Sequence, residues 1–373
     1  MSKFFMHFNK PLYWYISLSL FILASILFMN HNYFLYSKPI AKITDSRLVA
    51  TEDIVDRFEN DDHLYTQKLE AVIKNGDLKG QTITITNEYS DSSAYDHNYK
   101  VGDEVFVSVN EDKNEETHSG TIQSVKRDHY VVIVAWVFIL TLLFVGRKQG
   151  FFAVISLAAN AAILSFALDF YLKTGLSLLW ICGISIVIFT VISLLLVNGI
   201  NEKTFVTIIA TLLGTFISLL LTYLVMEVTN DSGLRYEEMQ FLTRPYRMVF
   251  IAGLFIGSLG AVMDVAITLV SSIYGLYEKK PDISIKALQA SGFEIGRDIM
   301  GTMTNILFFA YISGSIPMLI LYLKNSSPLG FTLSMNLSLE MARALAGGIG
   351  IVITIPIGLY TAIFFINRKR RNA

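Results

Sequence analysis

Eight long apolar runs dominate this sequence and leave few folds open to it. A helix that crosses a membrane needs about 20 mainly apolar residues, because only a helix satisfies its own backbone hydrogen bonds in hydrocarbon. Such runs occupy residues 12–29, 130–146, 151–171, 177–197, 204–227, 248–275, 300–323 and 342–366. Charged residues make up only 16% of the chain, against about 25% in soluble domains. The sequence therefore predicts an all-α polytopic membrane bundle of about eight transmembrane helices.

The segment between the first two runs has a different composition. Residues 30–129 hold 19 of the 31 acidic residues and 11 of the 30 basic ones, a local charge of -8, whereas the remainder carries +7. Stretches 82–86 and 104–109 alternate polar and apolar side chains with the period of half-buried strands. Residues 49–60 are more typical of a short helix. Turn-forming residues occur at 75–77, 102–103 and 119–120. We expect a small β-rich domain, with a barrel as one candidate architecture.

Lysine and arginine in the short loops predict the orientation. Basic clusters at 147–148, 279–297 and 368–371 fall on one side of the bundle. Both termini are therefore expected in the cytoplasm. The predicted parts are a cytoplasmic segment with the first transmembrane helix at 1–29, an extracytoplasmic acidic domain at 30–129, a seven-helix membrane domain at 130–366 and a basic cytoplasmic tail at 367–373. A cleaved signal peptide is the alternative for the first run, but no small-residue cleavage pattern follows it.

Metal, disulfide and cofactor chemistry have little support in the sequence. Cys182 is the single cysteine, which excludes a disulfide within one chain and a thiolate metal site. Histidines lie beside acids at Asp61-Asp62-His63 and Asp96-His97, where a cation site is conceivable. Scattered surface histidines near acids are commoner, however, and we expect no metal and no cofactor.

An acidic residue inside a predicted span is the main candidate for function. Asp264 lies in the inner half of the run at 248–275, where an ionisable side chain costs about 2.5–3.5 kcal/mol on insertion scales. Polar groups at a similar depth lie on the last two runs: Thr302, Thr304, Asn305, Thr354 and Pro356. Together they would suit a proton or a cation. The alternative is that Asp264 bonds to neighbouring helices and holds the bundle together, and for Asn305 the two interpretations are evenly balanced.

Charged pairs mark the ends of the last two spans. Arg297 and Asp298 stand at the start of the run at 300–323, where arginine suits an inside anchor and aspartate suits an N-cap. Glu340 and Arg343 stand three residues apart at the outer start of the last span and can pair on one helix face. Their contribution would be small if the pair is exposed.

Two further features concern helix ends and breaks. Residues 313–317 read Ser-Gly-Ser-Ile-Pro and should interrupt a span in its outer half. Broken helices of this kind are frequent in transporters. In the loop that precedes the predicted span at 300–323, Asp282 is expected to cap a short amphipathic helix from Ile283 to Ser291.

Several of these strings resemble the YibE/YibF family of bacterial membrane proteins. The most specific is Gly-Arg-Asp-Ile-Met-Gly-Thr-Met-Thr-Asn at 296–305, which accompanies the strings at 260–266, 340–343 and 347–350. The resemblance covers residues 130–366. It implies a bacterial cytoplasmic membrane and a helical bundle, and it supplies no established activity. The positions that match the family pattern are Asp264, Arg297, Asp298, Asn305, Glu340 and Arg343.

Three functions are consistent with the sequence. The first is a permease for a small solute or ion, coupled to protons or cations through Asp264. The second is a membrane subunit of an ATPase or secretion complex, since residues 285–292 faintly resemble the coupling helix of ATP-binding-cassette importer permeases. Any nucleotide hydrolysis would come from another chain, because the phosphate-loop motif is missing. The third is an extracytoplasmic binding or sensing module on a membrane anchor.

An enzyme is not expected, since the H-E-x-x-H and G-x-S-x-G motifs are missing. The expected partners are the lipid bilayer and either a second copy of the chain or another membrane or ATPase subunit. A net charge of -1 gives no reason to expect nucleic acid.

Overall fold

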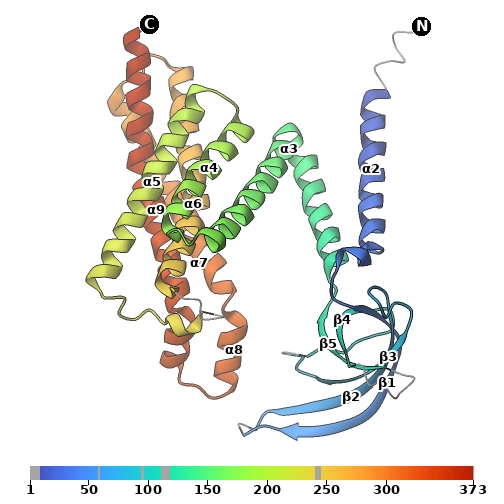
Figure 1. Cartoon of the computed structure of the whole chain (residues 1–373). Coiled ribbons are helices and arrows are strands. Elements are labelled where there is room, and N and C mark those ends of the chain that lie inside the picture. The colour runs from blue at the N-terminus through green and yellow to red at the C-terminus, as the bar shows by residue number, and fades with distance from the viewer. Residues whose placement is uncertain (1–8, 58, 94–95, 111–117, 240–244, 373) are drawn as a thin grey trace, which may run out of the picture. The chain divides into compact units, whose positions relative to one another are not determined.

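The computed structural model of the chain describes residues 9–57, 59–93, 96–110, 118–239 and 245–372. These residues form two compact units, Met1–Thr141 and Leu142–Ala373. Most of the chain is helical, and the strands of the described residues all belong to the first unit (Figure 1).

Five strands of the first unit close into a small barrel. They are β1 (Ile40–Val55), β2 (Asp61–Ile73), β3 (Thr82–Ser90), β4 (Glu104–Asn110) and β5 (His118–Val125). Their order around the barrel is β1-β2-β3-β5-β4. The β3–β5 pair is parallel, and the other pairs are antiparallel. This order is that of the five-stranded OB-type barrel.

Alternating side chains fill the barrel. Ile83 and Ile85 of β3 and Val105 and Val107 of β4 are at most 2% exposed, and the residues between them are less buried. This is the period of a strand with one face on a core. The strands expected at 82–86 and 104–109 and the expected β-rich domain are confirmed.

Two local expectations for this unit are wrong. Residues 49–55 do not begin a helix but continue β1, which pairs with β2 as far as Val55 opposite Asp61; the cross-strand pairing outweighs the local helical pattern. The supposed turn at 119–120 lies inside β5. A Cβ at Gly120 would lie 2.5 Å from the Ile83 side chain and from the Ser108 carbonyl oxygen. That glycine therefore permits close strand approach rather than a turn.

Helix α2 and the first part of α3, as far as Thr141, complete the first unit. α2 (Asn9–Met29) precedes the short 3-10 helix η1 (Asn32–Leu35), and α3 (Asp128–Thr174) follows β5. The Trp136 indole N–H of α3 donates to the Ser25 hydroxyl of α2 at 2.7 Å. Phe21 packs edge-on against the same indole. These contacts hold α2 beside the first part of α3.

A break divides α3 into two helical segments. Arg147 has φ 46° and ψ -119°, outside the helical region. A left-handed φ is uncommon for a residue with a side chain, so the helix does not run straight through this position. The break falls between the two predicted spans at 130–146 and 151–171.

The second unit packs its helices around α6. It contains the part of α3 after Thr141, α4 (Leu178–Asn198), α5 (Glu202–Val228), η2 (Tyr236–Glu238), α6 (Tyr246–Lys279), α7 (Ile285–Ser313), α8 (Ile316–Lys324) and α9 (Leu329–Asn372). α6 contacts α4, α5, α7 and α9 (Figure 1). The core forms where Val265, Leu269 and Ile273 of α6 meet Ile351 and Leu359 of α9, and each of these side chains is fully buried.

Glycines bring the core helices close together. The Thr354 hydroxyl occupies the space that a Cβ at Gly214 would take, and Val262 lies beside both. A Cβ at Gly350 would lie 2.9 Å from Val262 and 3.0 Å from the Ser218 hydroxyl. Small residues at helix contacts are the usual way in which membrane helices gain close packing.

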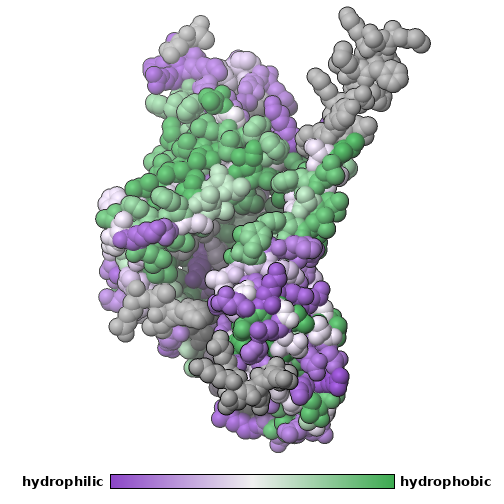
Figure 2. All heavy atoms as spheres, turned by 45° about the vertical axis from the view of Figure 1, so that its right-hand side comes forward, coloured by the Kyte–Doolittle hydropathy of each residue, from purple (hydrophilic) through white to green (hydrophobic). Residues whose placement is uncertain are grey.

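The apolar helices indicate a membrane protein. α3, α4, α5, α6 and α9 are each long and apolar enough to cross a membrane, and α7 with α8 forms a sixth candidate bent by 52°. The expected break near residues 313–317 is confirmed, whereas eight spans are not confirmed. Figure 2 shows hydrophobic side chains over the middle of the helical unit and hydrophilic ones at its ends.

α7 begins earlier than the sequence indicated. Ser284 is its N-cap, and the Ser284 hydroxyl accepts the Ala287 N–H at 3.2 Å. The helix then runs without interruption to Ser313. A separate helix from Ile283 to Ser291 capped by Asp282 is therefore wrong, because serine supplies the capping oxygen two residues later.

The early start of α7 also changes the interpretation of the two charges near its middle. Asp298 is not an N-cap, since it lies well inside the helix. Arg297 and Asp298 are both exposed on the helix surface.

Candidate functional site

A cavity lies at the break between α7 and α8. Its volume is about 550 Å³, within the range of about 300–1,000 Å³ that is usual for small-molecule sites. The polar part of its wall comes from Tyr311 of α7, Ser315 of the break, and Asn336, Glu340 and Arg343 of α9. The cavity therefore gathers polar groups from two apolar helices and the break.

The sequence of the break explains why the helix stops there. Pro317 stands in the first turn of α8, and a proline has no N–H to continue the hydrogen bonding of α7. The Ser315 N–H instead donates to the Ile312 carbonyl oxygen at 2.9 Å. The Ser315 hydroxyl donates to the Asn336 carbonyl oxygen at 3.2 Å, which ties the break to α9.

Glu340 and Arg343 form an ion pair at the cavity, as their spacing predicted. The two side chains are only 22% and 25% exposed, so the pair is not a loose surface contact. The Arg343 guanidinium also lies 5.3 Å above the Phe250 ring of α6, a cation–π contact. The pair thus presents one positive and one negative group to the cavity and connects α9 to α6.

Several polar atoms on the wall have no hydrogen-bond partner among the described residues. They are the Tyr311 hydroxyl, Asn336 Oδ1, Glu340 Oε2 and the remaining N–H groups of Arg343. These atoms are open to the cavity rather than fully buried, so each can hydrogen-bond to water or to a solute there. Convergence of these groups on one cavity is therefore the arrangement expected of a site that holds a polar solute.

Asp264 lies on an open face of α6, outside this cavity. Its side chain is exposed, and its carboxylate makes no hydrogen bond or ion pair with any described residue. Gly253, Gly260 and Thr268 share the face at helical spacing, and a Cβ at either glycine would meet nothing within 4 Å. A carboxylate against bare hydrocarbon is costly. In a membrane, water, an ion or another molecule has to meet this face.

Contacts between α6 and α7 show which residue of α7 lies at the same depth in the helical bundle as Asp264. The Tyr311 hydroxyl occupies the space of a Cβ at Gly257, and a Cβ at Gly292 would lie 3.0 Å from Ile273. The two helices are antiparallel, so Asp264 lies level with about residue 302 of α7. This agrees with the depth inferred from the sequence.

The polar residues of α7 face in different directions. Thr302 and Asn305 are exposed, and the Thr302 hydroxyl donates to the Ile299 carbonyl oxygen at 3.0 Å. Thr304 instead faces α9, where its methyl group lies 3.5 Å from the position of a Cβ at Gly348. Thr304 therefore serves helix packing, whereas Thr302 and Asn305 stay open to a ligand.

The two candidates on α9 do not join Asp264 in one pocket. Thr354 is fully buried, and its hydroxyl donates to the Gly350 carbonyl oxygen at 2.7 Å. It packs beside Val262, which is two residues before Asp264 and so points to the other side of α6. Pro356 lies inside the unbroken α9, where it is partly buried.

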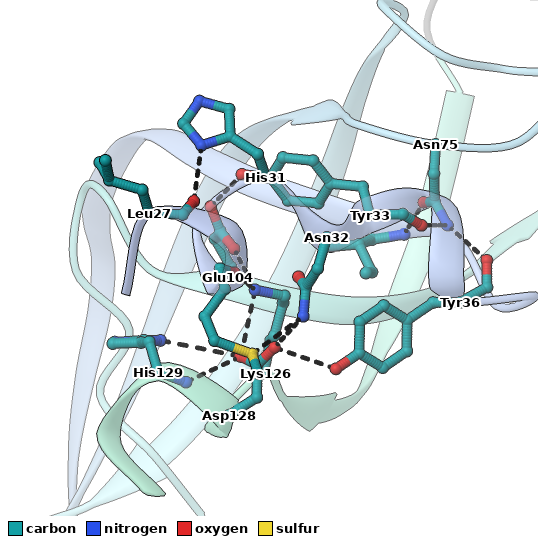
Figure 3. A network of polar contacts seen from close by, with 12 residues as sticks. Leu27, His31, Asn32, Tyr33, Tyr36, Asn75, Glu104, Lys126, Asp128 and His129 are labelled. Atoms are coloured by element: carbon teal, nitrogen blue, oxygen red, sulfur yellow. Dashed lines mark hydrogen bonds and ion pairs between the residues drawn. The ribbon is translucent and has the colours of Figure 1, made fainter. Parts of the chain in front are cut away.

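A second polar cluster lies in the first unit, where the barrel meets α2 and α3. Lys126 is 1% exposed, and its Nζ lies 3.1 Å from both the Glu104 and the Asp128 carboxylates. The same ammonium donates to the Met29 carbonyl oxygen at 3.0 Å. Figure 3 shows Glu104 of β4 and Asp128 of α3 pointing toward Lys126, which directly follows β5.

Neighbouring side chains complete the cluster around Lys126. Asn32 Nδ2 and the Tyr36 hydroxyl donate to Asp128 at 2.6 and 3.0 Å, and the Tyr33 hydroxyl donates to Glu104 (Figure 3). Burial and the hydrogen bond to Glu104 raise the pKa of Tyr33, so its phenol stays a donor. The arrangement fastens the barrel to both helices and is structural in kind.

The histidine–acid pairs do not form a metal site among the described residues. His63 Nδ1 lies 2.6 Å from Asp53 Oδ1 in the exposed part of the β1–β2 pair, and that hydrogen bond raises the pKa of His63. Arg127 donates to His97 at 2.8 Å. Within the part of the chain that the structure describes, no three histidine, cysteine, aspartate or glutamate side chains come together in a way that could hold a metal ion.

Comparison with known families decides the classification. The protein-family model described as YibE/F-like protein matches residues 134–368 of the chain. The family model described as YibE/F family N-terminal domain matches residues 34–125. The chain belongs to the YibE/F family. The second match assigns the barrel to the N-terminal domain of that family, and the first covers the helical chain from within α3 to near the end of α9. No curated protein and no solved structure matches.

Sequence reasoning missed part of the site in this YibE/F member. Tyr311 and Asn336 line the cavity, but neither belongs to a motif that marks it. The signal that pointed to the place was the helix-breaking stretch at 313–317. Lys126 was also missed, because a lysine beside an arginine at the end of a strand gives no sign of burial.

Proposed function

We propose that this protein is a membrane permease for a small solute, with the solute site in the cavity at the α7–α8 break. The observation that carries the proposal is the convergence of unpartnered polar groups on a cavity at a broken helix. Irregular backbone at membrane depth is tolerated where it lines a cavity. Discontinuous helices supply binding sites in many transporters.

The proposed topology has eight spans. Each span crosses the bacterial cytoplasmic membrane. The spans are α2, the two segments of α3 on either side of Arg147, α4, α5, α6, α7 together with α8, and α9. Both termini are cytoplasmic and the barrel is outside, because the basic tail and the basic loop before α7 then face the cytoplasm. The cavity belongs to the outer half of the bundle in this orientation.

Asp264 is the proposed coupling site for a proton or cation. It lies level with Thr302, and nine residues of α7 separate that level from Tyr311, which corresponds to about 13 Å. The solute and the ion would therefore bind at separate levels. Tyr311 provides a connection, since it lines the cavity and rests on Gly257 of α6.

Filling the cavity should stop transport. Gly314 has a helical φ of -66°, and a Cβ there would meet only the Tyr311 carbonyl oxygen at 3.8 Å. Gly314→Leu therefore places a side chain at the cavity wall and reduces the free volume of the cavity, without backbone strain. We expect it to slow uptake at least about tenfold in proteoliposomes offered a panel of labelled amino acids, sugars, carboxylates, amines and inorganic ions.

Gly301→Leu is the matched control, since Gly301 is an exposed position of α7 with nothing within 4 Å of its Cβ. It should transport like the wild type. The proposal fails if the wild type takes up no member of the panel, or if Gly314→Leu transports normally.

A membrane subunit of a larger complex is the second candidate. The observation that favours it is the open face of α6, where Asp264 lies between the exposed Gly260 and Thr268. Another chain could fill that face. Affinity purification from native membranes that recovers the protein without a stable partner would remove this candidate.

A further inference from the structure

The charges at the cavity balance each other. Arg343 and Glu340 both line it, and they are each about three-quarters buried. Their pairing uses Nη1 of the guanidinium and Oε1 of the carboxylate, which leaves N–H donors and one carboxylate oxygen without partners among the described residues. The pair can therefore accept further polar contacts of both kinds.

A solute with one charge would suit this pair poorly. An anion bound to the free N–H groups of Arg343 places a second negative charge beside Glu340, and a cation bound to the free oxygen of Glu340 places a second positive charge beside Arg343. An unpaired charge in a partly buried site is costly. A solute with both charges gives each member of the pair a new partner, and charge-assisted hydrogen bonds are the stronger kind.

The rest of the wall accommodates an apolar body. Met318, Met335 and Leu339 line the cavity together with Ala310. Methionine side chains are flexible and adapt to irregular shapes. The Tyr311 hydroxyl and Asn336 Oδ1 add one donor and one acceptor beside them.

We propose that the cavity binds zwitterionic solutes of the amino-acid type, with the carboxylate on Arg343, the ammonium on Glu340 and the side chain among the methionines. This inference rests on the proposed function, because it names the substrate class of the same site. It also adds a role for a pair whose spacing alone indicated only a helix-end contact.

The test is direct binding to the full-length protein in detergent micelles. Each of the common amino acids is titrated calorimetrically. The tightest one is then compared with the same molecule lacking its amino group and with the same molecule lacking its carboxyl group. We expect at least one amino acid to bind, and each truncated analogue to bind about 10- to 150-fold more weakly, the range for a lost hydrogen bond to a charged group.

Variants locate the site. Arg343→Met and Glu340→Gln should each weaken binding within the same range, whereas Lys173→Met, which removes the exposed pair with Asp169, should not change it. Gly314→Leu keeps both charges and fills the cavity, so it should abolish binding even if a charge variant fails to fold. Gly301→Leu should bind like the wild type.

The outcomes separate this inference from the permease proposal. If no amino acid binds, if an analogue with one charge binds as tightly as its parent, or if Gly314→Leu binds normally, the inference is overturned. Binding of amino acids without uptake into proteoliposomes would refute the permease and leave the inference standing. Uptake confined to solutes with one charge or none would support the permease and overturn the inference.

Discussion

Lys126→Met is expected to destabilise the barrel and its attached helices by about 3–5 kcal/mol, the cost of leaving partners of a buried ion pair without their counter-ion. Lys126 is almost fully buried, and Glu104 and Asp128 are only 13% and 19% exposed. Without the ammonium, two carboxylates remain close together with little water. Hydrogen exchange of the β4 amides in the full-length protein measures the effect, as protection lost by about two to four orders of magnitude.

Lys38→Met is the control for this substitution. Lys38 Nζ makes one long, exposed contact of 3.5 Å with Gln123, so its removal should change stability by no more than about 0.5 kcal/mol. Equal loss of protection in the two variants would show that the Lys126 cluster does not hold the barrel to α2 and α3.

Asp264→Asn is expected to abolish the dependence of uptake on a pH gradient. An asparagine has nearly the shape of the aspartate but cannot take up and release a proton at this level of α6. In proteoliposomes with an imposed gradient, accumulation should fall at least about tenfold. Exchange of labelled for unlabelled solute without a gradient should continue, because the cavity lies about 13 Å further along α7.

This pair of assays separates coupling from packing. If Asp264 only holds helices together, the substitution will lower exchange and gradient-driven accumulation alike. If both rates match the wild type, Asp264 has no part in the mechanism. Asp298→Asn is a suitable comparison, since Asp298 is exposed on α7 and does not lie on the α6 face.

The sequence predicted the fold wherever a pattern was repeated over many residues. The apolar runs correspond to long helices, and alternation at 82–86 and 104–109 corresponds to strands. Errors came where one contact distant in sequence decides the local structure. Residues 49–55 form the end of β1 and pair with β2. Position 120 has room only for a glycine, because Ile83 and Ser108 lie against it.

The candidate site was predictable only in part. The Glu340–Arg343 pair and the break at 313–317 follow from local spacing, and both are present. Thr354 could not be placed, because a hydroxyl at the right depth can point to either side of a helix. It points to Gly214 in the core rather than to the face of Asp264. Tyr311 and Asn336 join the cavity only because α7 packs against α9 and the chain bends by 52° between α7 and α8.

The most direct test of the permease is whether the cavity is reached from both sides of the membrane. The chain has one cysteine, the buried Cys182, so Cys182→Ala gives a background without thiols. Ser315→Cys then places a thiol at the break, and Ser326→Cys places one in the exposed loop after α8. We predict that a membrane-impermeant thiol reagent labels Ser315→Cys from either face of sealed vesicles but labels Ser326→Cys from one face only. Labelling of Ser315→Cys from a single face, or from neither, would contradict the account.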